Sequence, residues 1–391
     1  MRPALCLVSM SLIALCACQS DQPTPHIARA QPTTPAPETS ASTPRSVLPA
    51  GKAKKKTKKK KRPSPNVTSL SWNEKGELLV GWADGHFSLV DVKQKRGKIK
   101  KASSKGEVQA ISPDAKIALV RGEPNKIVRT KDRVALIELN RLEGVHGAVF
   151  STDGRTLMIS SANHIHVWKD VPKLPKLITK TGVRLDEYLS VEAGNWQAGL
   201  GEMSGPIAMD TGPHVAYGAP NGQLTWWDVQ NPTEAYAIAR VEPPMTSIAL
   251  KGDLLLATSG AGSLLAASVK ERQKLDWAKG LTAQQVAASP VIDGGFAMVS
   301  DDTLSYRSTE TGEVLWDATL GEGELCGLAL GAKATKKGMQ RKRVAVCKGN
   351  KISLYMIDGG KHRSTFERDR KRLIWTKPKK KKGGKKKSKK K

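Results

Sequence analysis

The chain has 391 residues, with 65 Lys/Arg against 36 Asp/Glu and a formal charge of +29. Nine Lys/Arg and no acid lie between Lys52 and Arg62, and seventeen Lys/Arg against two acids lie from Lys361 to Lys391. Together these stretches carry 24 of the 29 net charges, so we expect a nearly neutral folded part without a basic groove. The length allows one large core domain with tails.

Residues 1–17 predict an export signal. Arg2 is followed by a mostly apolar stretch from Ala4 to Ala17, which suits a secretory signal and is too short to span a bilayer. The stretch ends on Leu15-Cys16-Ala17-Cys18, which resembles a bacterial lipobox. The resemblance implies cleavage before Cys18, a diacylglyceryl group on its thiol and an acyl chain on its amine. Several acyl chains anchor durably, because each buried methylene contributes roughly 0.8 kcal/mol. An ordinary secretory signal is the alternative.

Residues 18–65 predict a disordered linker that ends in a lysine-rich block. The Pro/Thr-rich part has too few large apolar residues to offset its ordering entropy. Dense like charges in the block keep it solvated, and each Lys near an anionic lipid surface contributes about 1 kcal/mol. Anionic lipid or a cell-wall polymer is therefore the expected counter-ion, and export argues against nucleic acid. A purely solubilising role is the alternative.

From residue 66 to residue 360, one sequence pattern recurs, in which an apolar run leads into a polar turn. Its seven copies are Val67–Trp72, Glu107–Ser112, Val145–Phe150, Gly205–Asp210, Met245–Leu250, Gln284–Ser289 and Glu324–Leu330. Their start-to-start spacings are 40, 38, 60, 40, 39 and 40 residues. A period near forty with several short strands per unit is typical of β-propeller blades. We expect an all-β, seven-bladed propeller, with six or eight blades as alternatives, and disordered basic tails.

Three segments resemble known propeller families. Glu143–Lys169 resembles a WD-repeat blade, and Trp227-Asp228 carries the dipeptide itself. Thr309–Leu320 is closer to the Thr-Gly-x-x-x-Trp signature of quinoprotein-type propellers. Both families mostly use the propeller as a docking scaffold, although some quinoprotein-type members are enzymes. The resemblance also implies that acids such as Asp91 brace turns through hydrogen bonds.

The single long spacing predicts an insertion near residues 171–204, after the third blade. It contains Tyr188 and Trp196 among Gly and acidic residues. Long loops carry function in many scaffolds, and exposed aromatic residues anchor partners, so this loop is a candidate partner-binding site. The alternative is that Leu185, Tyr188, Leu189 and Trp196 form a local core.

Cys326 and Cys347 predict a disulfide in the last blade. Cys326 lies early in one expected strand, and Cys347 ends the next. The two positions are symmetric about the loop Gly331–Lys342, so an antiparallel hairpin places their Cβ atoms within bonding range. An exported compartment is oxidising enough to close the bond. Two buried free thiols are the alternative.

The stretch 361–391 is assigned to a lysine-rich C-terminal tail. Its first part contains Phe366, Leu373, Ile374 and Trp375, which could dock against the last blade or help to close the ring. The remainder consists almost entirely of Lys and Gly and should be disordered.

We find no pattern that predicts catalysis, a metal site or a cofactor. His164 and His166 share one strand face but lack a third ligand, and no Cys/His spacing suits zinc. A Gly-x-Ser-x-Gly elbow and phosphate-binding loops are absent. The expectation is a protein that is not an enzyme. A quinoprotein-like enzyme with a cofactor or metal in the channel is the alternative.

These observations predict a lipid-anchored protein of the bacterial envelope, whose propeller is a protein-interaction scaffold and whose basic tails bind anionic surfaces. Gln19 after the lipidated Cys18 favours the outer over the inner membrane, by analogy with enteric sorting. The alternative from the same structural class is a propeller lipoprotein like the assembly factor of outer-membrane β-barrels.

Overall fold

The computed structural model describes residues 64–139, 145–160, 165–168, 171, 205–210, 212, 214–219, 221–228, 235–334 and 340–377. Apart from short 3-10 turns such as η2 (Asp276–Ala278) and η3 (Asp358–Gly360), the regular elements of these residues are β-strands. None of the described segments forms a helix that is long and apolar enough to cross a bilayer.

The described strands form seven antiparallel sheets, and each sheet is built from consecutive strands. The first sheet contains β1 (Val67–Trp72), β2 (Leu78–Trp82), β3 (His86–Asp91) and β4 (Arg96–Lys101). The second contains β5 (Glu107–Ile111), β6 (Ile117–Arg121), β7 (Asn125–Arg129) and β8 (Val134–Leu139). The third contains β9 (Gly147–Phe150), β10 (Leu157–Ser160) and β11 (Ile165–Trp168).

The remaining four sheets continue in the same order along the chain. The fourth contains β12 (Ile207–Met209), β13 (His214–Gly218), β14 (Gln223–Asp228) and β15 (Ala235–Arg240). The fifth contains β16 (Met245–Lys251), β17 (Leu254–Ser259), β18 (Leu264–Ser268) and β19 (Gln273–Lys274). The sixth contains β20 (Gln285–Ala287), β21 (Gly295–Ser300), β22 (Thr303–Ser308) and β23 (Val314–Thr319). The seventh contains β24 (Leu325–Ala334), β25 (Gln340–Lys348), β26 (Lys351–Met356), β27 (His362–Asp369) and β28 (Arg372–Thr376).

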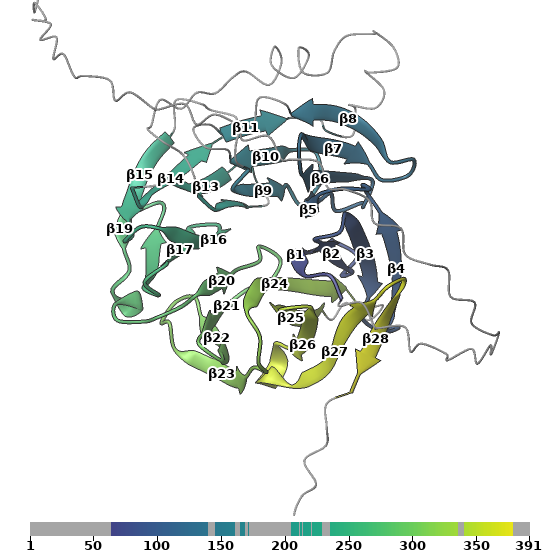
Figure 1. The fold of residues 1–391 in the computed structure, drawn as a ribbon. Coiled ribbons are helices and arrows are strands. Elements are labelled where there is room, and N and C mark those ends of the chain that lie inside the picture. Colours follow the sequence, from purple (N-terminus) through teal and green to yellow (C-terminus); the bar gives the residue numbers. More distant parts are fainter. Residues whose placement is uncertain are drawn as a thin grey trace, which may run out of the picture. The chain divides into compact units, whose positions relative to one another are not determined.

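The seven sheets are the blades of a closed ring (Figure 1). The first strand of each blade lies nearest the centre, and consecutive first strands contact each other around the ring until β24 contacts β1. The prediction of an all-β, seven-bladed propeller is therefore confirmed. Each of the seven predicted repeats overlaps the first strand of one blade.

The hydrophobic core is divided among the seven interfaces between blades. Each of the seven buried clusters combines apolar residues of two neighbouring sheets. In β2, Leu78 and Val80 belong to the cluster shared with the last blade, whereas Leu79 belongs to the cluster shared with the second blade. Side chains alternate between the two faces of a strand, so one run of apolar residues serves two interfaces. No blade can bury both faces without its neighbours.

Several first strands carry a bulge near their start, with hydroxyl groups that reach the next blade. The pairing shifts between Val67 and Ser69, and it shifts again between Met245 and Ser247. At the second of these bulges, the Thr246 hydroxyl donates to Gln284 O at 3.3 Å. A bulge leaves one extra residue unpaired and turns its side chain away from the ladder. Here the extra hydroxyls link neighbouring first strands near the centre.

The last blade extends beyond Gly360, where the sequence placed the end of the propeller. Strands β27 and β28 complete a five-stranded sheet that ends at Thr376. Phe366 is fully buried, and its ring lies 4.6 Å from that of Trp375. Of the stretch assigned to a tail, 361–376 therefore belongs to the ring. The correction also moves six of its Lys/Arg onto the folded part.

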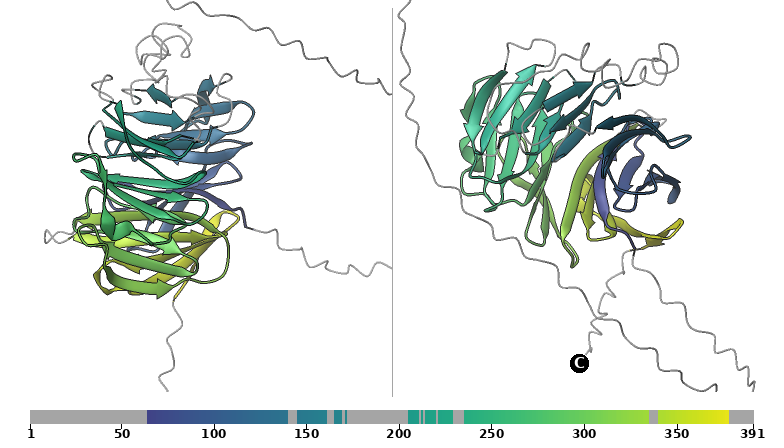
Figure 2. Two further views of the ribbon diagram at one scale, coloured as in Figure 1. Left: turned by 90° about the vertical axis from the view of Figure 1, so that its left-hand side faces the viewer. Right: turned by 45° about the horizontal axis from the view of Figure 1, so that its top comes forward.

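The interface between the last and first blades, here called the closure seam, joins the two ends of the ring. Figure 2 shows the yellow C-terminal strands against the purple N-terminal strands in both views. Arg368, 3% exposed, donates from Nη1 to Asp84 Oδ1 at 2.7 Å, and its guanidinium lies 5.5 Å from the Trp82 ring centroid. A Cβ on Gly97 of β4 would collide with Leu373 Cδ1, so the glycine permits β28 to lie against β4.

Candidate functional site

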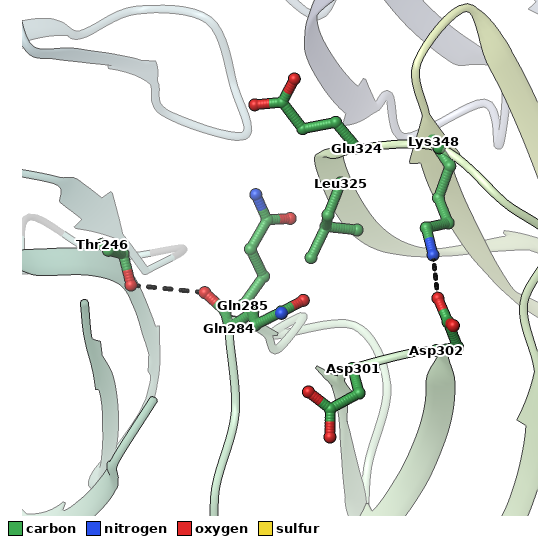
Figure 3. Close-up of a pocket in the computed structure, with 9 residues that line it drawn as sticks. Thr246, Gln284, Gln285, Asp301, Asp302, Glu324, Leu325 and Lys348 are labelled. Carbon is green, nitrogen blue, oxygen red and sulfur yellow. Dashed lines mark hydrogen bonds and ion pairs between the residues drawn. The ribbon is translucent and has the colours of Figure 1, made fainter. Parts of the chain in front are cut away.

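A hollow of about 570 Å³ opens where the first strands of blades five, six and seven begin (Figure 3). Its lining consists of Thr246, Gln284, Gln285, Asp301, Asp302, Gly323, Glu324, Leu325 and Lys348. Gln285 and Leu325 begin β20 and β24, Asp301 and Asp302 form the turn from β21 to β22, and Lys348 ends β25. We call this site the blade-six hollow.

The blade-six hollow is rich in hydrogen-bond acceptors. Lys348, with a side chain 10% exposed, bonds to Asp302 Oδ1 at 2.5 Å and so links blade seven to blade six. Figure 3 shows this bond beside the two glutamine amides, with Asp301 and Glu324 at the rim. The one lysine of the hollow is paired with Asp302. The carboxylates of Asp301 and Glu324 are two further acceptors in the lining of the hollow. Its chemistry suits a cationic or hydrogen-bond-donating group, such as a Lys or Arg side chain of a partner.

The ring carries its charge unevenly, contrary to the expectation of a nearly neutral propeller. Residues 284–324, which form blade six, contain eight Asp/Glu and one Arg. The described residues 325–334 and 340–377, which form blade seven, contain thirteen Lys/Arg and three Asp/Glu. The expectation failed because basic residues of β27 and β28 were counted as tail, and because a small net sum hid opposite charges on neighbouring blades.

The basic charge of blade seven continues onto the outer strand of blade one. Residues 93–101 contain six Lys/Arg and no acid, and Arg96, Lys98 and Lys100 of β4 are exposed. Arg370, Lys371 and Arg372 at the β27–β28 turn are exposed as well. Because β4 and β28 are the outer strands of neighbouring blades and contact each other, these six residues lie on the ring's outer rim at the closure seam. Arg96, Lys98 and Lys100 project from the face of β4 that is turned toward blade two, whereas Gly97 faces β28. We call them the basic seam surface; nothing in the sequence placed the two strands together.

A buried arginine in the same seam adds to this positive charge. Arg343 of β25 is 7% exposed, and among the described residues its Nη1 has no hydrogen-bond partner. Burial lowers the pKa of Arg343, and the charges of Arg341 and Arg363 lower it further, while Asp91 opposes them. A buried donor without a partner costs free energy, so Nη1 of Arg343 does not contribute to holding the seam.

Asp91 shows the turn-bracing role that the WD-repeat resemblance implies. Its Oδ1 accepts hydrogen bonds from the backbone N–H groups of Lys93 at 2.8 Å and Gln94 at 3.1 Å. Burial by itself raises the pKa of Asp91, but these hydrogen bonds and the charge of Lys333 bring it below its usual value. The carboxylate therefore holds the turn between β3 and β4.

The structure joins Cys326 and Cys347 in a disulfide with a Cα–Cα distance of 5.2 Å. The register differs in detail from the symmetric pairing expected from sequence. Cys347 pairs with Gly327, and Cys326 is the extra residue of the bulge between Leu325 and Gly327. In this blade, a cysteine takes the bulge position that Thr246 occupies in blade five.

Reduction of this bond should lower the free energy of unfolding by about 3 kcal/mol, because a closed loop of this length restricts the unfolded chain. The measurement is urea unfolding followed by tryptophan fluorescence, with and without a reductant. The Cys326→Ala/Cys347→Ala double variant is the control and should not respond to the reductant. An unchanged midpoint for the wild-type protein would contradict the stabilising role.

The histidines singled out from sequence are not gathered into a metal site in the described part. His166 stacks on Trp168 with ring centroids 5.8 Å apart, whereas His164 lies outside the described residues. No group of three His, Cys, Asp or Glu residues within the described ranges is placed to hold a metal ion. Three further predicted residues, Cys18, Tyr188 and Trp196, also lie outside the described residues.

Comparisons with known proteins support the fold and do not name a family. No family model and no curated protein matches the sequence. The chain is similar to the crystal structure of the computationally designed Ika8 protein, with a TM-score of 0.52 and 13% identity over 81% of this chain and 97% of that chain. At that identity, the likeness shows the fold alone.

Proposed function

We propose that this protein is a lipid-anchored protein of the bacterial envelope whose propeller is a protein-interaction scaffold, with basic segments that bind anionic envelope material. The observation that carries the scaffold role is the ring, in which the buried clusters lie between blades. The turns on its two faces therefore contribute little to the core and are free to form a recognition surface.

The blade-six hollow is the site at which we expect a partner to bind. Its acceptors require donors, so the partner should present a Lys or Arg side chain, with an apolar group against Leu325. The crosslinked partner should be recovered from the protein's own envelope fraction. Its capture should weaken in a Gln285→Lys/Glu324→Lys variant, which places cations at the opening.

Two features support export and anchoring. The sequence Leu15-Cys16-Ala17-Cys18 resembles a lipobox, and the disulfide of the last blade suits an oxidising compartment. The lysine-rich block that follows the linker would then lie within reach of the anchoring membrane, where anionic lipid attracts it. By analogy with enteric sorting, Gln19 after the lipidated Cys18 favours the outer membrane.

The Cys18→Ser variant should remain unlipidated and leave the membrane fraction at high salt, because the thiol that accepts the diacylglyceryl group is gone and salt screens the basic segments. The wild-type chain, expressed in a bacterium, should yield a mature N-terminus at Cys18 with the mass of attached acyl chains. Cys16→Ser is the matched control and should stay lipidated. A mature N-terminus at another residue, or membrane retention of Cys18→Ser after a high-salt wash that screens the basic segments, would contradict the lipid anchor.

A further inference from the structure

The outer strands of the first and last blades form one basic edge although they lie at opposite ends of the propeller sequence. β28 contacts β4, and Leu373 of β28 lies against Gly97 of β4. Figure 1 shows the two strands next to each other on the outside of the ring. Arg370, Lys371 and Arg372 therefore lie at the same outer rim as Arg96, Lys98 and Lys100, which project from the face of β4 opposite the one that meets β28.

The charge of this edge is exposed and largely unneutralised. Lys98, Lys371 and Arg372 are exposed and have no ion pair among the described residues. Asp84, a nearby acid, is already paired with Arg368. An incoming anion would therefore meet free cations here.

Protection of an exposed sheet edge is a second explanation for lysines on β4, since charged side chains discourage pairing with another strand. The other described outer strands carry no such block of cations: β15 contains Arg240 and β19 contains Lys274 as its one charged residue. β23 contains Asp317 as its one charged residue, and β8 contains Glu138. Edge protection in this ring therefore does not require a block of cations. The concentration of cations at one seam is better explained by binding to an anionic partner.

We propose that the basic seam surface rests on an anionic lipid bilayer, so that the ring stands on its edge with its axis parallel to the membrane. This inference rests on the proposed function and adds the orientation. The two basic arms flank the ring in the sequence: residues 52–62 precede β1 of the first blade, and the C-terminal lysines follow β28 of the last blade. The acidic edge of blade six, with exposed Glu313 and Asp317, is repelled by the same lipid. Both faces of the ring stay open to protein partners.

Lysine acetylation of the lipidated full-length protein tests the orientation. The protein is reconstituted into vesicles of phosphatidylcholine alone or mixed with phosphatidylglycerol, treated with an acetylating reagent and mapped by mass spectrometry. With phosphatidylglycerol, Lys98 and Lys371 should lose most of their labelling. The exposed Lys270, Lys274 and Lys279 of blade five should stay reactive in both vesicles.

The outcomes separate the orientation from the proposed function. Failure of the protein to associate with phosphatidylcholine vesicles would contradict the lipid anchor. Protection of Lys54–Lys56 and the C-terminal lysines, with Lys98 as reactive as Lys270, would support anionic binding by the arms and overturn the orientation. Equal labelling of all lysines in both vesicles would overturn the orientation and also the binding of anionic lipid by the basic arms.

A charge variant provides a second measurement. In Lys98→Gln/Lys371→Gln/Arg372→Gln, the remaining Lys100 should lose its protection at a lower salt concentration, because fewer cations face the lipid and salt screens the rest. Lys270→Gln/Lys274→Gln/Lys279→Gln removes the same number of charges from blade five and should protect Lys100 as the wild type does. Equal behaviour of the two variants would overturn the role of the seam.

Discussion

A chain that ends at Gly360 should not fold, whereas a chain that ends at Lys377 should fold as the full-length protein does. The shorter chain lacks β27 and β28, and with them the fully buried Phe366. Loss of one such aromatic side chain from a core costs about 3–5 kcal/mol. Trp375, Leu373 and Arg368 are lost as well, and the sum exceeds the stability of many domains.

The expected readout is cooperative thermal unfolding by circular dichroism, with protease resistance as a second probe. The chain ending at Lys377 controls for removal of the lysine tail, because it lacks only 378–391. A Gly360-terminated protein that unfolds cooperatively near the full-length temperature would show that β27 and β28 are dispensable and that the ring closes without them.

Asp84→Ala should cost about 3 kcal/mol, although Asp84 lies on the surface. It leaves the Arg368 guanidinium buried without its counter-charge, and breaking a buried pair from one side costs about 3–5 kcal/mol. We expect a cost at the lower end of this range, because the Asp84 side chain is 40% exposed and water can partly replace it. Arg368→Met should cost less, since it removes the charge and keeps an unbranched side chain against Trp82.

Urea unfolding of the two single variants and the double variant gives the coupling energy between Asp84 and Arg368. Glu138→Ala, which breaks the exposed Lys126–Glu138 pair, is the control and should cost no more than about 1 kcal/mol. A larger loss for Arg368→Met than for Asp84→Ala would contradict the argument, because it would place the stabilisation in side-chain packing.

The same pair predicts a pH dependence. Burial raises the pKa of Asp84, but the hydrogen bond and charge of Arg368, with a contribution from His86, bring the pKa below its usual value. A carboxylate with a lowered folded-state pKa contributes stability above its unfolded pKa and loses it as the pH falls through the folded value. The wild-type protein should therefore lose stability below about pH 4 more steeply than Asp84→Asn does.

The parts of the fold that follow from local patterns could be predicted. The repeat spacing marked all seven first strands, because turn residues and apolar runs act over a few residues and recur in each blade. The docking of Phe366, Leu373 and Trp375 against the ring was among the expectations and is confirmed, but the boundary at Gly360 was wrong, because polar residues occupy most inward positions of β27. In β27, Ser364, Phe366 and Arg368 are the buried residues, and only one of them is apolar.

The candidate site was less accessible to prediction than the fold. Gln285, Asp302, Glu324 and Lys348 come from two blades and from strand starts, turns and strand ends. No regular spacing in the sequence connects these residues of the hollow. Cys326 and Cys347 were found because a hairpin relates its two strands by simple symmetry. The bulge at Cys326 still required coordinates, since one extra residue changes which side chains lie opposite each other.

The sequence by itself determined the repeat, the strand content and the two lysine-rich arms, because periodicity and composition are properties of neighbouring residues. The tertiary structure decided where the ring closes, which strands meet at the closure seam and how charge is divided around it. Those features depend on contacts such as Asp84 with Arg368 and Gly97 with Leu373, which join the two ends of the propeller. Side chains so distant in sequence acquire a common surface only when the ring is complete.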